Sequence, residues 1–295
     1  MPGPRTHTTR TVLDGLSFAE GPRWHDDALY FSDMHAHRIM RMTEDGSTQV
    51  VAEVLDDDPS GLGWLPDGRL LIVAMETQTV RRVEPDGSVV IHADLTADAR
   101  GSLNDMIVAA DGTAYVGDMG TNIQDASSPR QTGQTFKIAP DGSFSCAADD
   151  MQSPNGHILT DDGRTLIVAE SGAARVTAFD VAADGELSNR RVFASLAALK
   201  EGYPAVADGI CLDAEGAVWY ADPLGGGVCR VLSTGEVTDE IRFDDVIPVA
   251  CVLGGADRKT LYICVAADWK RDVVAASKTG RIDACEVEVA GAGRP

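Results

Sequence analysis

The feature that most constrains the fold of this chain is a hairpin signal that recurs six times. Each copy has an acidic turn residue, usually followed by glycine, and then a run rich in Val, Ile, Leu and Tyr, as in "PDGRLLIVA" and "DDGRTLIVAE". An Asp-Gly turn between apolar runs is a strong signal for a tight β-hairpin. The acidic residues of the six copies are Asp27, Asp67, Asp111, Asp162, Glu215 and Asp257. The pattern therefore predicts an all-β chain built from repeated hairpins.

The spacing of the copies identifies the repeating unit. Successive acidic turn residues lie 40, 44, 51, 53 and 42 residues apart. A second turn follows each copy, as in "EDGS" and "STGE", so each unit contains two hairpins and about four strands. Four strands in each repeat of this length are typical of a propeller blade. The sequence thus predicts a six-bladed β-propeller as a single domain over residues 1–295, closed by pairing "RTVLDG" near the N-terminus with "ACEVEV" near the C-terminus.

Charge and composition exclude several classes of partner. There are 46 acidic and 25 basic residues, a formal net charge of −21, and such a surface repels nucleic acid and anionic membranes. No secretory signal is visible, and apolar runs such as "LLIVAM" are too short to span a bilayer. The six cysteines form no C-x-x-C motif, which favours reduced structural thiols over disulfides or a metal cage. We expect a cytoplasmic protein with neither nucleic-acid nor membrane partners. The sequence leaves its oligomeric state open.

One position of the repeat carries the candidate chemistry. The residue seven places before each acidic turn residue opens the strand that leads into the first hairpin, which is the innermost strand of its blade. Inner strands of a propeller line the central channel, so equivalent positions should point at one axis and form a ring. The members of this predicted ring are Glu20, Ser60, Asn104, Asn155, Asp208 and Ala250.

Five of the six ring residues carry a side-chain oxygen, and this pattern indicates a metal. The carboxylates of Glu20 and Asp208 would repel each other near one axis, and burial would raise the cost. Small polar residues lining a watery channel would explain Ser60, but not these carboxylates together with two asparagines. The predicted ligands supply only oxygen: Glu20, Asn104, Asn155 and Asp208. We therefore predict one divalent cation in the channel, with Ca²⁺ favoured and Mn²⁺, Mg²⁺ or Zn²⁺ as alternatives.

Several motifs resemble those of one known family. The stretches that carry the resemblance are "AEGPRW", "PNG", "ADG" and "CVLGGADRKTLYIC". Together they are similar to the SMP-30/gluconolactonase/LRE family, and the resemblance covers essentially the full chain. It implies a six-bladed propeller and a divalent-metal-dependent hydrolase.

The resemblance also implies roles for individual residues. Glu20, Asn155 and Asp208 match the metal ligands of the family. Asp208 also matches an aspartate that is implicated as general base or nucleophile. Asn104 matches a position that contacts substrate in some members and metal in others, including the related diisopropylfluorophosphatases.

The function that follows is opening of a lactone, a cyclic ester, by a carboxylic ester hydrolase of gluconolactonase type. The cation would polarise the carbonyl group while Asp208 takes a proton from the attacking water. Asn104, Ser102 and Met119 are the expected substrate contacts. Met34, His35, His37 and Met119 fall in loops that we expect to shape the wall of the pocket. Ser102 stands where sugar-lactonase members often carry arginine, which predicts a substrate less polar than a free sugar lactone.

Two alternatives stay open at this point. One is phosphotriester cleavage, with the same cation holding a phosphoryl oxygen. The other is a non-catalytic propeller that encloses a structural ion. Ser60 and Ala250 are small and weakly ligating, so they leave part of the ring unfilled and favour an open site.

Other polar residues are assigned mainly structural roles. The second strand of each of five blades ends near a carboxylate that would either support the ligands or form a turn: Asp33, Glu76, Asp118, Glu170 and Asp222. We do not expect His35 and His37 to hold a metal, and we expect a structural hydrogen bond from His157.

Overall fold

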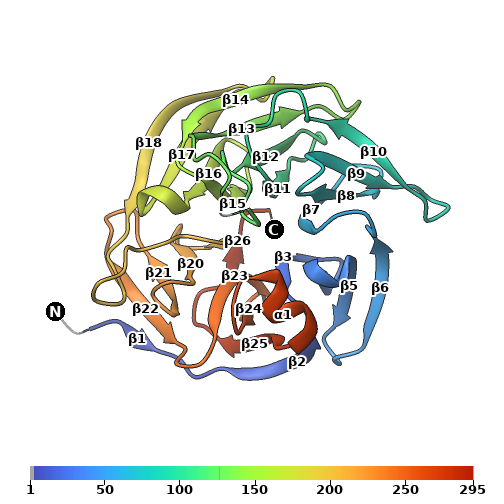
Figure 1. Ribbon diagram of the computed structural model, residues 1–295. Helices are drawn as coiled ribbons and strands as arrows, with labels where there is room; N and C mark the ends of the chain where they lie inside the picture. Colours follow the sequence, from blue (N-terminus) through green and yellow to red (C-terminus); the bar gives the residue numbers. More distant parts are fainter. Residues whose placement is uncertain (1–2, 126, 295) are drawn as a thin grey trace.

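The computed structural model describes residues 3–125 and 127–294. Six sheets stand around a central axis like the blades of a wheel (Figure 1). The predicted six-bladed β-propeller is thereby confirmed. Blades are numbered here by the order of their innermost strands along the chain.

Blades 1 to 4 are consecutive four-stranded antiparallel sheets. Blade 1 contains β3 (Ala19–His25), β4 (Ala28–Asp33), β5 (Arg38–Thr43) and β6 (Thr48–Glu53). Blade 2 contains β7 (Pro59–Trp64), β8 (Leu70–Ala74), β9 (Thr79–Val83) and β10 (Val89–Asp94). Blade 3 contains β11 (Leu103–Val108), β12 (Ala114–Asp118), β13 (Gly133–Ile138) and β14 (Phe144–Met151). Blade 4 contains β15 (Pro154–Leu159), β16 (Thr165–Glu170), β17 (Arg175–Val181) and β18 (Leu187–Ser195).

The last two blades include both ends of the chain. Blade 5 contains β19 (Ile210–Asp213), β20 (Val218–Asp222), β21 (Gly227–Val231) and β22 (Val237–Arg242), flanked by β1 (Arg5–Thr6) and β26 (Gly291–Ala292). Blade 6 contains β23 (Ile247–Gly254), β24 (Thr260–Ala266) and β25 (Gly280–Glu286), with β2 (Arg10–Leu16) as its outermost strand. Because β2 pairs with β25, the predicted closure of the ring is confirmed.

The second strand of each blade is buried on both faces. All residues of β8 and of β20 are buried, since each strand lies between the inner and third strands and also packs against neighbouring blades. Their near-continuous apolar sequences, "LLIVA" and "VWYAD", suit that environment. Outer strands such as β6 expose most of their side chains. The buried strands therefore hold the inner strands, and the channel that these line, in fixed positions.

A glycine follows the ring position in four blades because neighbouring inner strands nearly touch there. A Cβ atom added to Gly61 would lie 2.4 Å from the backbone nitrogen of Met106, and one added to Gly209 would lie 2.4 Å from the Cβ of Ala250. The four glycines are Gly21, Gly61, Gly156 and Gly209. The close packing of blades around the axis therefore explains why glycine follows the ring residue in the pairs "EG", "SG", "NG" and "DG".

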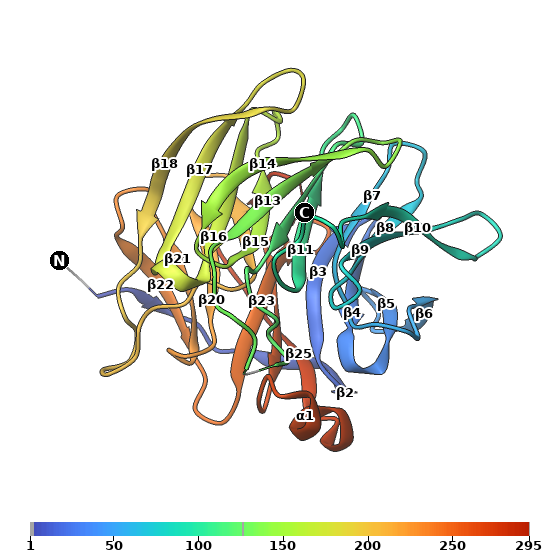
Figure 2. The same ribbon diagram turned by 45° about the horizontal axis from the view of Figure 1, so that its top comes forward.

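The two ends of the channel differ. At one end the C-terminal segment crosses the inner strands, where β26 pairs with β19 and Arg294 forms a bridge with Leu159. The other end carries η1 (Met34–Ala36), η2 (Ser171–Ala173), the connection over residues 119–132, and α1 (Arg271–Ser277), which stands out from the sheets in Figure 2. Within the described part of the chain, no helix is long and apolar enough to cross a membrane.

Candidate functional site

The ring positions lie at the start of the inner strands. Four of them are the second residues of β3, β7, β11 and β15; Asp208 lies two residues before β19, and Ala250 lies inside β23. The four predicted ligands line one cavity of about 460 Å³: Glu20, Asn104, Asn155 and Asp208. Four different blades therefore deliver oxygen-bearing side chains to a single cavity.

The remaining two ring residues, Ser60 and Ala250, contact neighbouring inner strands. Ser60 is fully buried, and its hydroxyl donates a hydrogen bond to Oδ1 of Asn104 at 3.0 Å. The amide nitrogen of Asn104 faces the sulfur of Met119 at 3.4 Å. Ala250 packs its methyl group next to Gly209. Asn104 is thus held by its neighbours with its amide in a defined orientation.

Among the described residues, the two carboxylates at the ring positions of the cavity, those of Glu20 and Asp208, have no cationic partner in an ion pair. Burial raises the pKa of Glu20 well above its usual range, and the charge of Asp208 adds to this shift, although Gly21 donates a backbone hydrogen bond to Glu20 at 2.7 Å. Burial also raises the pKa of Asp208 to about 7, with the hydrogen bond from Asn155 opposing the shift and the charge of Asp105 adding to it. Two buried carboxylates that disfavour each other's ionised form are the donor chemistry that a divalent cation would satisfy.

The donor set also indicates which kind of cation fits. Among the described residues, no three His, Cys, Asp or Glu side chains form a metal-binding group. The four ring residues in the cavity instead offer two carboxylates and two amide oxygens. Such a set suits a hard, oxygen-preferring cation better than the nitrogen and sulfur ligands typical of zinc.

Carboxylates at the ends of second strands fix the segments that lead into the cavity. Asp33, the last residue of β4, accepts hydrogen bonds from the backbone N–H groups of Ser17 at 2.8 Å and Phe18 at 3.1 Å, just before Glu20. Asp118 accepts the backbone N–H of Arg100 at 2.7 Å. Each carboxylate therefore ties its strand end to the chain that enters the inner strand of the same blade.

Blades 4 and 5 also have a hydrogen-bonded carboxylate at the end of the second strand. Glu170 accepts the backbone N–H of Gln152 at 2.8 Å, and it also binds Arg175 and Thr177. Asp222 accepts the N–H of Gly225 at 2.8 Å and so also closes its own turn. The sequence left open whether these carboxylates support the ligands or form turns. Asp33, Asp118 and Glu170 bind backbone that leads into an inner strand, whereas Asp222 closes its own turn and Glu76 binds side chains.

The predicted substrate contacts lie in different places. Asn104, Met119 and Met34 line the cavity. Ser102 does not: it is buried behind the wall, where its hydroxyl donates to Glu76 at 2.7 Å and accepts the N–H of Ile123 at 3.3 Å. A direct substrate contact for Ser102 is thus not supported by its position. Its place in the structure is as an anchor for the 119–132 connection.

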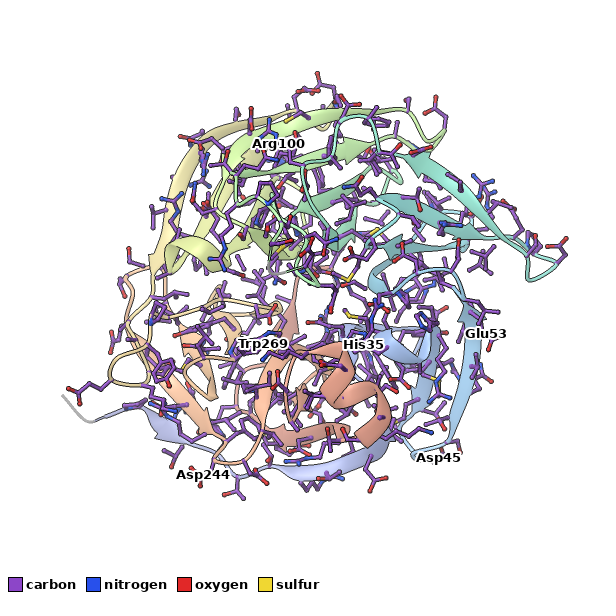
Figure 3. The ribbon with its side chains drawn as sticks, in the orientation of Figure 1. His35, Asp45, Glu53, Arg100, Asp244 and Trp269 are labelled. Atoms are coloured by element: carbon purple, nitrogen blue, oxygen red, sulfur yellow. The ribbon has the colours of Figure 1, made fainter. Side chains whose placement is uncertain are left out.

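Arg100 and the histidines lie outside the cavity. Arg100 pairs with Asp149 at 2.6 Å and lies at the periphery of the ring in Figure 3. His35 contacts Asp58 at 3.2 Å, and Nδ1 of His37 donates to a backbone carbonyl. His157 is buried, its Nδ1 donates to the carbonyl of Asn155 at 2.5 Å, and burial lowers its pKa to about 4. These histidines therefore have structural contacts, and His35 and His37 do not line the cavity as expected because they bind the Asp57–Asp58 segment.

A buried ion pair that the sequence did not reveal lies among the inner strands, deeper in the channel. Nη2 of Arg23 donates to Asp105 at 2.6 Å, and Asp105 also accepts the backbone N–H of His157 at 3.1 Å. This joins blades 1, 3 and 4 through one carboxylate. Asp105 stands where other blades have glycine, directly after Asn104, and that substitution in the repeat is the signal that could have identified it.

Comparisons with known proteins agree with this architecture. A family model described as the SMP-30/gluconolactonase/LRE-like region matches residues 18–267. Regucalcin from Xenopus laevis is 30% identical over 270 residues, which cover 88% of each chain. Regucalcin from Homo sapiens is 27% identical over 254 residues, which cover 84% of this chain and 83% of that protein.

Solved structures give the same result. A calcium-binding protein, regucalcin from Agrobacterium tumefaciens, aligns with a TM-score of 0.79 at 20% identity and covers 100% of this chain and 99% of its own. A gluconolactonase from Xanthomonas campestris aligns with a TM-score of 0.74 at 25% identity and covers 98% and 95% of the two chains. The family model and the relatives agree, and the chain belongs to the SMP-30/gluconolactonase/LRE family.

Proposed function

We propose that this protein is a divalent-metal-dependent lactonase. The observation that carries the proposal is the convergence of four oxygen-bearing side chains from four blades in one open cavity. Two of them are carboxylates that form no ion pair with any residue the structure describes. A cavity of about 460 Å³ is far larger than an ion needs, which favours a site that also admits an organic ligand over an enclosed structural ion. The gluconolactonase and the calcium-binding regucalcin among its relatives support the same class of activity.

The side chains divide into holding and reacting roles. Glu20, Asn104, Asn155 and Asp208 would hold the cation, with Ca²⁺ favoured by the oxygen donors. When bound, that cation would supply stabilisation of the negative charge that develops on the lactone carbonyl oxygen. Asn104, fixed by Ser60, orients the ester group.

Asp208 is the proposed proton acceptor. Its carboxylate faces the cavity, it accepts a hydrogen bond from Asn155, and it is less deeply buried than Glu20. An attacking water next to Asp208 loses its proton to this carboxylate as the oxygen adds to the carbonyl carbon, and the ring oxygen then leaves with a proton. The product is an open-chain hydroxy acid.

The wall of the cavity indicates which lactones fit. Much of it is apolar and sulfur-rich, with Phe18, Met34, Met75 and Met119 among its lining residues. Such a wall stabilises alkyl groups by burying them. We propose alkyl-substituted γ- or δ-lactones as substrates in preference to free sugar lactones.

The test is a panel of lactones assayed on protein whose metal content is measured. Chelated protein should be inactive, Ca²⁺ or Mn²⁺ should restore activity, and kcat/KM should be higher for alkyl lactones than for gluconolactone. A phosphotriester in the same panel tests the phosphotriesterase alternative. Full activity after complete removal of metal, or no lactone hydrolysis by fully loaded protein, would contradict the proposal.

A further inference from the structure

The open end of the cavity carries two basic side chains, although the chain as a whole is strongly acidic. Arg130 lies in the connection between β12 and β13, Lys270 immediately precedes α1, and both line the cavity. Among the described residues, neither side chain has an ion-pair partner, whereas the adjacent Arg271 is paired with Asp58. Within the described part of the chain, Lys270 makes hydrogen bonds only through its backbone: its N–H donates to Asp268, and its carbonyl accepts from Val273 and Val274. These two cations are therefore free to contact whatever enters.

The other charges of the cavity leave a positive surplus at this rim. Asp125 also lines the cavity, but its carboxylate accepts hydrogen bonds from the backbone N–H and the hydroxyl of Ser127, at 2.9 and 2.7 Å. The two deep carboxylates would be matched by one divalent cation. The rim then has two cations against one carboxylate, in a protein whose formal net charge is −21.

Between the deep donors and the rim, the cavity wall is mostly apolar. Met34, Met75, Met119, Ile247 and Val249 are among its lining residues. Trp269 is 49% exposed beside Lys270 and lies near the central axis in Figure 3. An occupant that suits this arrangement has a reactive group at one end, an apolar body, and a negative charge at the other end.

We propose that the cavity accepts a lactone whose apolar substituent ends in a carboxylate, and that Arg130 and Lys270 bind this carboxylate. The inference rests on the proposed lactonase function and specifies its substrate class. A single negative charge matches the surplus at the rim, and a guanidinium group binds a carboxylate with two parallel hydrogen bonds. Because the acidic surface repels anions at long range, a local pair of cations at the mouth is what such a substrate requires.

The experiment compares two γ-lactones with the same alkyl chain, one ending in a carboxylate and the other in the neutral primary carboxamide. Wild-type protein loaded with Ca²⁺ should show a kcat/KM about tenfold higher for the carboxylate, the order expected of two partly exposed ion pairs. This ratio should fall in Arg130→Gln and in Lys270→Gln and approach one in the double variant. It should also fall at high ionic strength, because salt screens exposed charges.

Arg164→Gln is the matched control. Arg164 is exposed in the turn between β15 and β16, at the other end of the channel, and its removal changes the net charge by the same amount. The ratio should be unchanged in this variant. A general loss of active protein lowers the apparent kcat/KM for both lactones by the same factor, so it leaves their ratio unchanged.

The outcomes separate the two proposals. Hydrolysis of both lactones without preference, or a preference that survives in the double variant, would overturn the anionic subsite and leave the lactonase function standing. Hydrolysis of neither lactone by metal-loaded protein would overturn the function and this inference with it. A stronger preference for a phosphate-terminated lactone would overturn the assignment of the carboxylate.

Discussion

At the scale of single residues, the site depends on carboxylates placed where their charge is unfavourable. Glu20 and Asp208 are buried in one cavity, and neither forms an ion pair with a basic side chain in residues 3–125 and 127–294. The nearest buried cation, Arg23, is already committed to Asp105. The fold therefore keeps a local electrostatic conflict that a bound cation would remove, as expected at functional sites.

Asp208→Asn separates catalysis from metal binding. The substitution retains a side-chain oxygen but removes the proposed proton acceptor, so kcat should fall by on the order of 10²-fold or more at saturating metal. Metal should still bind when supplied in excess, because Glu20, Asn104 and Asn155 are unchanged. Asn155→Asp is the control, since it adds a charge and should bind metal at least as tightly as wild type. Near wild-type turnover by metal-loaded Asp208→Asn would remove Asp208 from the mechanism.

The raised pKa of Asp208 predicts how stability depends on pH. A carboxyl whose pKa is higher in the folded state than its usual 3.8 stabilises the fold while protonated, and this contribution is lost as the pH rises toward about 7. In chelated protein, the Tm of wild type should therefore fall relative to the Tm of Asp208→Asn as the pH rises from about 4 to 7. Stabilisation by Ca²⁺ should grow over the same range, since ligation needs the carboxylate form. Thermal unfolding of both proteins across this range, with and without Ca²⁺, measures both effects, and a difference that does not change with pH would contradict the assignment.

At the scale of elements, the repeat predicted the inner strands because the same constraints act in every blade. Asp-Gly turns mark the first hairpin, and a glycine after the ring position permits close approach to the next blade, so periodicity alone located all four candidate ligands. Irregular parts were not predictable in this way. The seven residues of α1 are too few to show helical periodicity, and the contact of Ser102 with Glu76 depends on the path of the 119–132 connection. Arg130 and Lys270 come from such connections, so the repeat contains no information about them.

Gly156→Ala tests the close packing of the inner strands. The added Cβ would lie 2.7 Å from the carbonyl oxygen of Asp208 and 2.7 Å from the backbone nitrogen of Ile210, so the backbone that carries Asp208 must shift. We expect a loss of about 1–3 kcal/mol in the free energy of unfolding, together with weaker Ca²⁺ binding. Gly172→Ala is the control, because its Cβ would have 3.2 Å to the nearest atom and lies outside the inner strands. Urea unfolding and calorimetric Ca²⁺ titration give the two readouts, and equal effects in both variants would argue against this packing role.

At the scale of the whole molecule, the cavity exists because the ring is closed. The four candidate ligands come from β3, β11, β15 and the segment before β19, so no single blade contains the site. Their relative positions depend on all six blades being packed face to face around the axis. The N-terminal segment completes this arrangement, since β2 forms the outer strand of blade 6 and β1 pairs in parallel with β22 of blade 5 (Figure 1).

Removal of the closing strand should therefore affect the site from a distance. A chain that begins at Ser17 lacks β2, which buries Leu16 and partly buries Val12 and Leu13, and we expect a loss of about 3–5 kcal/mol in the free energy of unfolding. The bare edge of β25 should also promote aggregation. A chain that begins at Thr8 is the control, because it loses β1 and keeps β2, and its loss should be much smaller. Both are measured by urea unfolding and Ca²⁺ titration. β2 contributes no residue to the cavity, so it can act on the metal site only through the packing of blade 6 against blades 1 and 5. If the chain that begins at Ser17 bound Ca²⁺ as tightly as wild type, the metal site would not depend on closure of the ring.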